Sequence, residues 1–451
     1  MRSPLPIDGA TRVLGVRPLA LRSRSVSRAP RALRHRDFAL LWSGQTASGV
    51  GDGIYTVALA LETLRISDHA STLAYVEAAR LAPNVLILLL AGALVDRLPR
   101  RLVVLGADAA RGLAIAAMAG LVAAHALNVA ELVVISIVVG VADAFFYPAY
   151  QAIIPELLPQ ELLTQGNAFN SGSQSFAQSL AGPALGGVLV AAFGASSAFA
   201  IDAASFAISA GCLIAMRAVP APARSGKSMF ADAKDGFRWV MGQPWLWFGI
   251  LAVSVANFAG FATFAVLGPL LVRDVLHQGP AAFGAVFAAA GLGAIIAAIV
   301  AGRLGTPRRI VTVIWTSWGI ASLCDVAMAF SPDAIVVGVL VAAIFGLMIY
   351  GNLLWQTMMQ TLVPSEMLGR ASSVDWLFSI SISPVGILVA GALASSIGVR
   401  ETIFAGGCLA AVSCLVVLHP RMHDPERTGQ FGARDAASDL GAFGSEAPPV
   451  S

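Results

Sequence analysis

The sequence predicts an all-α membrane protein whose twelve transmembrane helices form two pseudo-symmetric bundles of six. Of its 451 residues, 57% are hydrophobic and only 12% are charged, against about 25% charged residues in ordinary soluble domains. Apolar stretches of about 20 residues, enough to cross a bilayer as a helix, recur from Phe38 to Leu418. The two halves of the chain also repeat short sequences at matching positions. This composition excludes a soluble enzyme.

Each half contains six apolar segments that we expect to be helical. They cover residues 39–64, 73–95, 102–125, 130–152, 166–192 and 197–217 in the first half, and 245–272, 281–303, 309–330, 333–357, 370–396 and 401–418 in the second. The longest internal polar stretch, Arg217 to Pro244, separates the halves. Its amphipathic piece, Met229 to Met241, is expected to lie on the membrane surface.

The chain is accordingly divided into five parts. We expect a disordered, arginine-rich cytoplasmic tail at 1–37, a six-helix bundle at 38–217, a cytoplasmic linker with an amphipathic helix at 218–244, a second bundle at 245–418, and a second disordered cytoplasmic tail at 419–451. The first tail carries nine arginines and is too long and irregular for the start of a signal peptide. A wrongly assigned upstream start codon would equally explain the first part of this tail. We therefore leave open whether residues 1–35 belong to the native protein.

Lysine and arginine counts orient the bundle. With both termini in the cytoplasm, 24 of the 29 basic residues lie inside and four outside, and Arg111 falls within a helix. Cytoplasmic loops of membrane proteins carry such an excess. We therefore expect a multi-pass protein of the inner or plasma membrane with both termini inside. The basic residues lie between apolar runs, so no nucleic-acid partner is expected.

Internal repetition indicates two similar halves. Residues 91–101 read Ala-Gly-Ala-Leu-Val-Asp-Arg-Leu-Pro-Arg-Arg, and residues 301–309 read Ala-Gly-Arg-Leu-Gly-Thr-Pro-Arg-Arg. Likewise, 158–161 (Leu-Pro-Gln-Glu) resembles 363–366 (Val-Pro-Ser-Glu). Paired six-helix halves in parallel orientation are typical of one large class of transporters.

The first of these loops resembles the signature between helices two and three of the major facilitator superfamily. The matching residues are Gly92, Asp96, Arg97, Arg100 and Arg101. A carboxylate at the C-terminal end of its own helix is unfavourable, so Asp96 needs an outside partner. The resemblance implies that this loop is a conformational switch that braces the two halves. The positive-inside rule explains the arginines equally well, but it does not explain Asp96.

A second motif, Gly182, Pro183, Gly186 and Gly187, resembles the Gly-Pro-x-x-Gly-Gly element of exporters in this superfamily. Proline kinks a helix and glycine permits close helix packing, and generic packing is the competing interpretation. Stretches around Asp143, Asn167 and 201–206 narrow the resemblance to the drug-exporter branch with macrolide-efflux and enterobactin-exporter-like proteins, over residues 33–418. Ser136 stands where many proton-coupled exporters carry an arginine in helix four.

Two acidic residues are candidates for proton coupling. Asp52 and Asp143 lie about halfway along helices one and four, which line the cavity in this superfamily. Ionisable groups at bilayer depth are costly and usually functional. The alternative is that both only hydrogen-bond within their half. Four other sites are interpreted as structural: a self-neutralising Asp108–Arg111 pair, Asp202, Asp325, and Asp375, which we place near the start of helix eleven.

Amide and aromatic residues predict a cavity wall suited to bulky amphipathic molecules. Amides recur every four residues on helices five and ten. The candidates are Gln45, Asn170, Gln174, Gln178, Asn257, Asn352, Trp355, Gln356 and Trp376. Interhelical hydrogen bonding, at about 0.6 kcal/mol per contact, is an equally good interpretation for any single amide.

Taken together, these features predict a secondary active transporter that exports a drug-like or secondary-metabolite molecule by proton antiport with alternating access. There is no phosphate-binding loop for ATP hydrolysis, and no histidine or cysteine cluster suggests a metal, cofactor or catalytic site. The expected partners are a small-molecule substrate, protons and the lipid bilayer, and the family implies a monomer. The alternatives are a siderophore exporter, a nutrient importer of the same fold, and a membrane enzyme or sensor.

Overall fold

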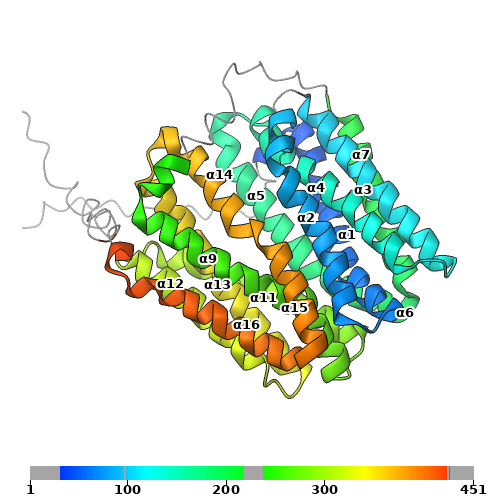
Figure 1. The fold of residues 1–451 in the computed structure, drawn as a ribbon. Helices are drawn as coiled ribbons and strands as arrows, with labels where there is room; N and C mark the ends of the chain where they lie inside the picture. Colours follow the sequence, from blue (N-terminus) through cyan, green and yellow to red (C-terminus); the bar gives the residue numbers. More distant parts are fainter. Residues whose placement is uncertain (1–30, 96–97, 218–236, 424–425, 427–451) are drawn as a thin grey trace, which may run out of the picture.

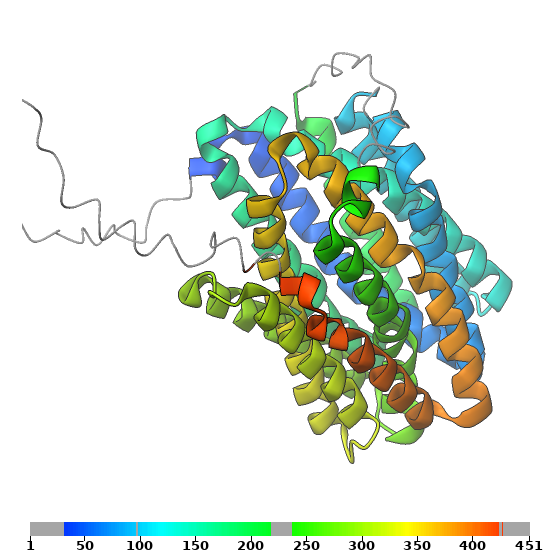
Figure 2. The same ribbon diagram turned by 60° about the vertical axis from the view of Figure 1, so that its left-hand side comes forward.

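The computed structural model describes residues 31–95, 98–217, 237–423 and 426. In this part of the chain the regular elements are helices and no strand occurs. Figures 1 and 2 show two bundles: the N-terminal half, coloured blue to green-cyan, and the C-terminal half, coloured green to red. The all-α prediction is confirmed.

The N-terminal bundle contains the helices α1 (Arg36–Ile66), α2 (Ala70–Val95), α3 (Arg100–Ala123), α4 (Val129–Leu157), α5 (Leu163–Phe176), α6 (Gly182–Phe193) and α7 (Ala195–Ala215). A π-helical turn at Ala177–Ala181 joins α5 to α6. These two helices therefore form the single segment predicted as helix five. Pro183 lies two residues after the turn and has no N–H to donate to the carbonyl of Ser179, so the irregular backbone falls where the regular pattern of helical hydrogen bonds would fail.

The C-terminal bundle contains α9 (Pro244–Ala262), α10 (Gly268–Leu270), α11 (Pro280–Leu304), α12 (Ile310–Met328), α13 (Ala334–Leu362), α14 (Ser365–Ser381), α15 (Ser383–Ile397) and α16 (Val399–Cys414). Two π-helical turns, Thr263–Leu267 and Leu271–Val275, continue α9 through α10. Helices α14 and α15 meet at Ile382, before Pro384, and correspond to predicted helix eleven. Proline again marks the irregular position in each case.

Ten segments of the described chain are long and apolar enough to cross a membrane. Helices α1 and α2 are not among them, but they are 31 and 26 residues long, and about 20 residues suffice to span a bilayer. The chain is therefore a multi-pass membrane protein. Twelve crossings remain a prediction with respect to α1 and α2.

The two bundles share one hydrophobic core at a single end of the molecule. This core joins the end of α1 and the start of α2, including Leu64 and Ala74, to residues of the C-terminal half such as Leu270, Phe287 and Ile403. It lies at the end that carries the α1–α2 loop, which the charge pattern predicts to be extracellular. At the opposite end each half has a separate core, around Phe38 and Ile153 in the first half and around Trp245 and Met358 in the second.

The predicted boundaries of both tails were wrong by a few residues. Arg31–Arg34 form a 3-10 turn in which the methyl group of Ala32 is fully buried in the N-terminal core. Pro420–His423 form another, in which Met422 is buried in the C-terminal core. Apolar burial orders both segments. Residues 1–30, 424–425 and 427–451, and most of the predicted amphipathic piece Met229 to Met241, lie outside the described residues.

Candidate functional site

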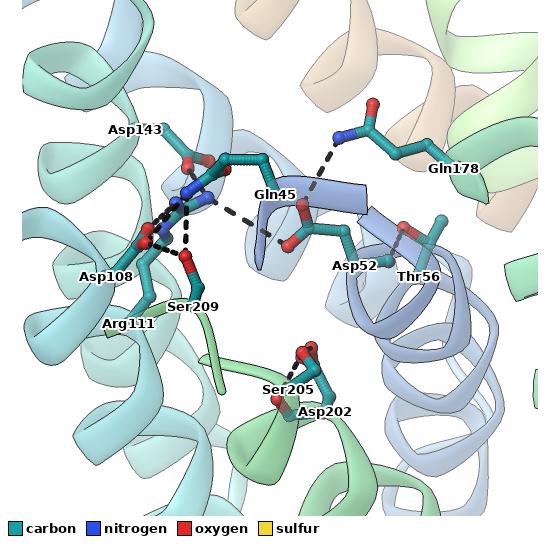
Figure 3. Close-up of polar contacts among 10 residues, drawn as sticks. All are labelled: Gln45, Asp52, Thr56, Asp108, Arg111, Asp143, Gln178, Asp202, Ser205 and Ser209. Atoms are coloured by element: carbon teal, nitrogen blue, oxygen red, sulfur yellow. Dashed lines mark hydrogen bonds and ion pairs between the residues drawn. The ribbon is translucent and has the colours of Figure 1, made fainter. Parts of the chain in front are cut away.

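A charged cluster around Arg111 occupies the interior of the N-terminal bundle (Figure 3). Arg111 and Asp108 lie one turn apart on α3, and Nη2 of the arginine is 2.5 Å from Oδ1 of Asp108. Nη1 of Arg111 donates a hydrogen bond of 3.2 Å to Oδ1 of Asp143 on α4. The same Nη1 is 3.9 Å from Oδ1 of Asp52 on α1. One guanidinium therefore lies within ion-pair distance of three carboxylates from three helices.

Neutral side chains hold Asp108 in place. Gln45 on α1 donates to Oδ2 of Asp108 at 2.9 Å, and Ser209 on α7 donates to the same oxygen at 2.7 Å. Asp108 is completely buried. The guanidinium of Arg111 also stacks between Phe146 and Phe206, with its Cζ 4.1 and 4.6 Å from the two ring centroids. Cation–π contacts in a dry interior hold an arginine strongly.

Asp52 is the most accessible carboxylate of the cluster. Its side chain is 29% exposed, whereas those of Asp108 and Asp143 are 0% and 12% exposed. Gln178, on the π-helical turn that precedes α6, donates to Oδ2 of Asp52 at 3.2 Å. Asp52 thus joins the buried cluster to a helix that packs against the other half of the molecule.

The charges of the cluster do not balance when every group is ionised. Three carboxylates and one guanidinium give a formal charge of −2 (−3 + 1). Uncompensated charge is expensive in a membrane interior. Protons are the smallest ions that can neutralise this excess, so the arrangement is chemically suited to taking up and releasing protons.

The predicted pair of Asp108 and Arg111 is confirmed, but the pair is not self-contained. Sequence reasoning missed that Arg111 also contacts both proton-coupling candidates, Asp52 and Asp143. The available signal was charge counting: several acids and a single arginine fall at similar depth in the first half. Ser209 and the bond from Gln178 to Asp52 gave no separate signal in the sequence.

The Gly-Pro-x-x-Gly-Gly element lies between two helices of different halves. A Cβ atom added at Gly182 would lie 2.6 Å from the Cα of Gly53 on α1, and one added at Gly187 would lie 2.8 Å from the Cα of Gly284 on α11. Gly186 faces Ile54 on α1. The glycines of this element therefore allow α6 to contact its own bundle and the opposite bundle at once.

The predicted switch loop is only partly described. Gly92 lies on α2, and Asp96 and Arg97 lie outside the described residues. Arg100 donates to the backbone carbonyl of Ala152 at 2.9 Å and pairs with Glu156, both on α4. Arg101 donates to the carbonyl oxygens of Leu213 and Ile214 at the end of α7. Both arginines thus tie helix ends together within the N-terminal half.

The candidate cavity residues divide into two groups. Gln45, Asn170 and Trp355 are more than nine-tenths buried. Gln45 bonds inside its own bundle, and Asn170 accepts from the hydroxyl of Tyr150 on α4. The prediction that Gln45 lines a cavity was therefore wrong, because its amide donates to Asp108 on α3 and to Ser209 on α7. The other candidates are exposed or half-buried: Gln174, Gln178, Asn257, Asn352, Gln356 and Trp376.

Trp355 belongs to an aromatic and acidic cluster in the C-terminal bundle. Its Nε1 donates to Oδ2 of Asp375 at 3.0 Å, and Ser379 donates to Oδ1 at 3.3 Å. Its ring contacts those of Trp245 and Trp318. The placement of Asp375 at a helix start was wrong: α14 begins at Ser365, so Asp375 lies almost three turns inside, where side-chain donors rather than backbone amides satisfy it.

Comparison with curated proteins gives exporters as relatives. The chain is 27% identical over 380 residues to the multidrug efflux pump Tap of Mycolicibacterium fortuitum, covering 81% of this chain and 91% of the pump. It is 28% identical over 361 residues to the enterobactin exporter EntS of Escherichia coli, covering 77% of this chain and 84% of the exporter.

Solved structures support the fold at low sequence identity. A bacterial homologue of the human lysosomal transporter Spinster, in an inward-facing and unoccupied conformation, superposes with a TM-score of 0.65 at 13% identity, covering 89% of this chain and 98% of that one. The nucleoside transporter NupG gives a TM-score of 0.64 at 13% identity, covering 85% and 99%.

Finally, a sequence model of the family described as "transmembrane secretion effector" matches residues 27–436, nearly the whole chain. Together with two packed helical bundles and the relatives above, this match establishes a transporter of small molecules rather than an enzyme. The chain belongs to the transmembrane secretion effector family of the major facilitator superfamily.

Proposed function

We propose that the protein exports drug-like or secondary-metabolite small molecules across the cytoplasmic membrane by proton antiport. The observation that carries the proposal is the cluster in which Arg111 contacts Asp52, Asp108 and Asp143. Its excess negative charge favours proton uptake, and Asp52 is exposed enough to exchange protons with the solvent. The named activities of the relatives Tap and EntS support export.

Alternating access is the proposed mechanism. The core shared by both halves at the predicted extracellular end, and the separate cores at the other end, are consistent with an inward-facing state. Release of substrate to the outside requires the shared core to open while the cytoplasmic ends approach. Gln178 contacts Asp52 and lies on the helix that packs against α11, so a change of charge at Asp52 acts directly on the interface between the halves.

The substrate is proposed to be bulky and amphipathic. Asn352 and Gln356 are exposed on one face of α13, and the indole of Trp376 on α14 is 57% exposed. Amides facing lipid would lose their hydrogen bonds, so this face is suited to a polar, partly aromatic cavity between the halves. We further propose that both termini are cytoplasmic and that the protein works as a monomer in the inner or plasma membrane.

The test is accumulation of fluorescent dyes and antibiotics in cells that lack their own pumps. Wild type, Asp52→Asn, Asp143→Asn and empty vector would be compared with and without a protonophore. Asp333→Asn is the matched control, because Asp333 caps α13 outside the cluster and asparagine also caps helices. We expect cells with wild type or Asp333→Asn to accumulate less dye than cells with empty vector. We expect the protonophore, and the change Asp52→Asn, to abolish this difference. Full activity of Asp52→Asn would reject its role in coupling.

Siderophore export is the second candidate. Similarity to an enterobactin exporter over 361 residues favours it. Deletion of the gene would then reduce siderophore in the medium and slow growth under iron limitation, and the dye panel would show no difference between wild type and vector. Protonophore-sensitive accumulation of a nutrient inside cells would instead indicate an importer.

A further inference from the structure

We propose that Asp202 on α7 is a second proton-binding carboxyl of the N-terminal bundle, separate from the Arg111 cluster. The inference deepens the proposed proton antiport and depends on it for the role of Asp202 in transport. It replaces the interpretation of Asp202 as a purely structural residue. Figure 3 shows Asp202 and Ser205 beside α1, apart from the group centred on Arg111.

The carboxyl group of Asp202 is fully buried and poorly supplied with donors. Asp202 is 0% exposed, and its Oδ2 has no hydrogen-bond partner among the described residues. The hydroxyl of Ser205 is 2.7 Å from the backbone carbonyl oxygen of Asp202 and 3.3 Å from its Oδ1. A hydroxyl has one hydrogen, and the shorter contact takes it. An ionised Asp202 would therefore have no donor of its own.

Protonation of Asp202 removes the need for a separate hydrogen-bond donor to its carboxyl group. With a proton on Oδ1, the carboxyl donates to the oxygen of Ser205, while the Ser205 hydroxyl donates to the Asp202 backbone carbonyl. Every hydrogen then has an acceptor, as is usual for buried polar groups. The neutral form also avoids placing an unpaired charge in the membrane interior.

The charged groups around Asp202 offer no counter-ion. Helices α1, α3 and α6 pack against α7. Helix α1 presents Asp52 and Tyr55, α3 presents Asp108 and Arg111, and α6 contains no titratable residue. Arg111 is shared among three other carboxylates and forms no ion pair with Asp202 in the described part of the chain. A buried carboxylate without a partner is strongly destabilising.

Gly51 allows Asp202 to lie against the backbone of α1. A Cβ atom added at Gly51 would lie 2.3 Å from both Oδ1 of Asp202 and Oγ of Ser205. The acid therefore lies against the backbone of α1, one residue before Asp52. Ser48 and Tyr55, three residues before and four after Gly51, are both buried, and neither hydroxyl has a hydrogen-bond partner in the described part of the chain. These hydroxyls give the site further polar groups that can carry a proton.

The two carboxyls suggest an order for proton movement. Asp52 is partly exposed and exchanges protons with the solvent, whereas Asp202 stores one in the interior. On transfer, the O–H bond of Asp202 breaks and an O–H bond forms on the carboxylate of Asp52, with no change in total charge, and the unpaired carboxylate left at Asp202 then favours uptake of another proton. The N-terminal bundle can thereby carry a second proton in each transport cycle.

Infrared spectroscopy of the purified, lipid-reconstituted full-length protein tests the assignment without any substrate. Protonated carboxyl groups absorb apart from carboxylates, and their bands shift in heavy water. Wild type near neutral pH should show a protonated-carboxyl band that Asp202→Asn lacks and Asp333→Asn keeps. An unchanged protonated-carboxyl region in Asp202→Asn would overturn the proposal. The band would persist even in a chain that exports no dye. Failure of the proposed export function can therefore be distinguished from failure of the Asp202 assignment.

Two further measurements keep the test decisive. If Asp202→Asn does not fold, Gly51→Ala should shift or remove the same band, because its new methyl group meets the Asp202 carboxyl; an unmoved band would contradict the assignment. Thermal unfolding in sodium chloride and in choline chloride should give equal midpoints for wild type. Sodium-specific stabilisation that Asp202→Asn abolishes would identify a metal-cation site and overturn the proton assignment.

Discussion

Gly187 on α6 and Gly284 on α11 lie in backbone contact across the two halves. A Cβ atom added at Gly284 would lie 2.7 Å from the carbonyl oxygen of Pro183 and 2.8 Å from the Cα of Gly187. Two turns further along α11, Gly291 faces the carbonyl of Ser179 even more closely. Because this interface joins backbone to backbone, no flexible side chain can make room for an added atom.

Gly284→Ala should therefore destabilise the state described here relative to the state open to the outside. Overpacking costs about 1–3 kcal/mol, which corresponds to a population shift of roughly 5- to 150-fold. The measurement is labelling of a single cysteine at Leu64, buried in the shared core, by a membrane-impermeant maleimide in a background without native cysteines. Labelling should become faster. Gly172→Ala, on α5 with open space around its Cβ position, is the control and should change nothing.

Arg273 ties the two halves together at the same end. From the C-terminal half it donates to the carbonyl oxygen of Leu64 and lies 3.2 Å from Asp68. Asp68 is 91% exposed, so this ion pair contributes only about 0–1 kcal/mol. The hydrogen bond from a charged donor to Leu64 contributes more, about 1.5–3 kcal/mol. Arg273→Ala should therefore increase maleimide labelling at the outer end far more than Asp68→Asn.

Arg400→Ala is the matched control for this tether. Arg400 lies at the same end and donates to the carbonyl oxygens of Ala329 and Ser331, all within the C-terminal half. Its loss removes an arginine with two backbone contacts but no contact between halves. Equal labelling of Arg273→Ala and Arg400→Ala would show that Arg273 has no specific role in closing the outer end.

Sequence patterns predicted the helices well, because the bilayer imposes one requirement on every span: about 20 apolar residues with internally satisfied backbone groups. The segment predicted at 166–192 corresponds to α5 and α6, and its proline accounts for the π-helical turn between them. The Asp108–Arg111 pair was equally predictable, since residues three apart share a helix face.

Contacts between distant helices were not predictable in this way. Gln45 and Ser209 meet at Asp108 although 164 residues separate them, and hydropathy does not record which face of α1 meets α7. For the same reason, Gln45 was wrongly placed in a cavity wall. Asp375 was misplaced for a different reason: α14 begins five residues earlier than the predicted helix start at 370, because its polar first turn hides the boundary.

Arg111→Gln should strongly destabilise the protein. It removes the guanidinium shared by Asp52, Asp108 and Asp143, and breaking a buried ion pair costs about 3–5 kcal/mol. Thermal unfolding in detergent should show a large loss of stability. The double variant Asp108→Asn, Arg111→Gln should recover part of it, because one uncompensated charge is removed with the arginine. A double variant less stable than Arg111→Gln would contradict this account.

Trp355→Phe should destabilise the C-terminal bundle through Asp375. The substitution removes the N–H that donates to Oδ2 of Asp375 at 3.0 Å and leaves that buried oxygen without its donor. An unsatisfied buried polar group costs about 1–3 kcal/mol. Trp315→Phe is a close control, because Trp315 lies in the same aromatic cluster, with its ring centroid 5.1 Å from that of Trp318. Its indole nitrogen has no hydrogen-bond partner in the described part of the chain.

The comparison of these two tryptophans separates hydrogen bonding from packing. Both substitutions remove similar aromatic volume, so their difference in unfolding midpoint reports the bond to Asp375. Trp355→Phe should lower the midpoint clearly, and Trp315→Phe should lower it less. Combining Trp355→Phe with Asp375→Leu should cost less than the sum of the single changes, with a coupling energy of about 0.5–3 kcal/mol. Additive effects, or equal losses for both tryptophans, would mean that Asp375 is held by its surroundings and not by Trp355.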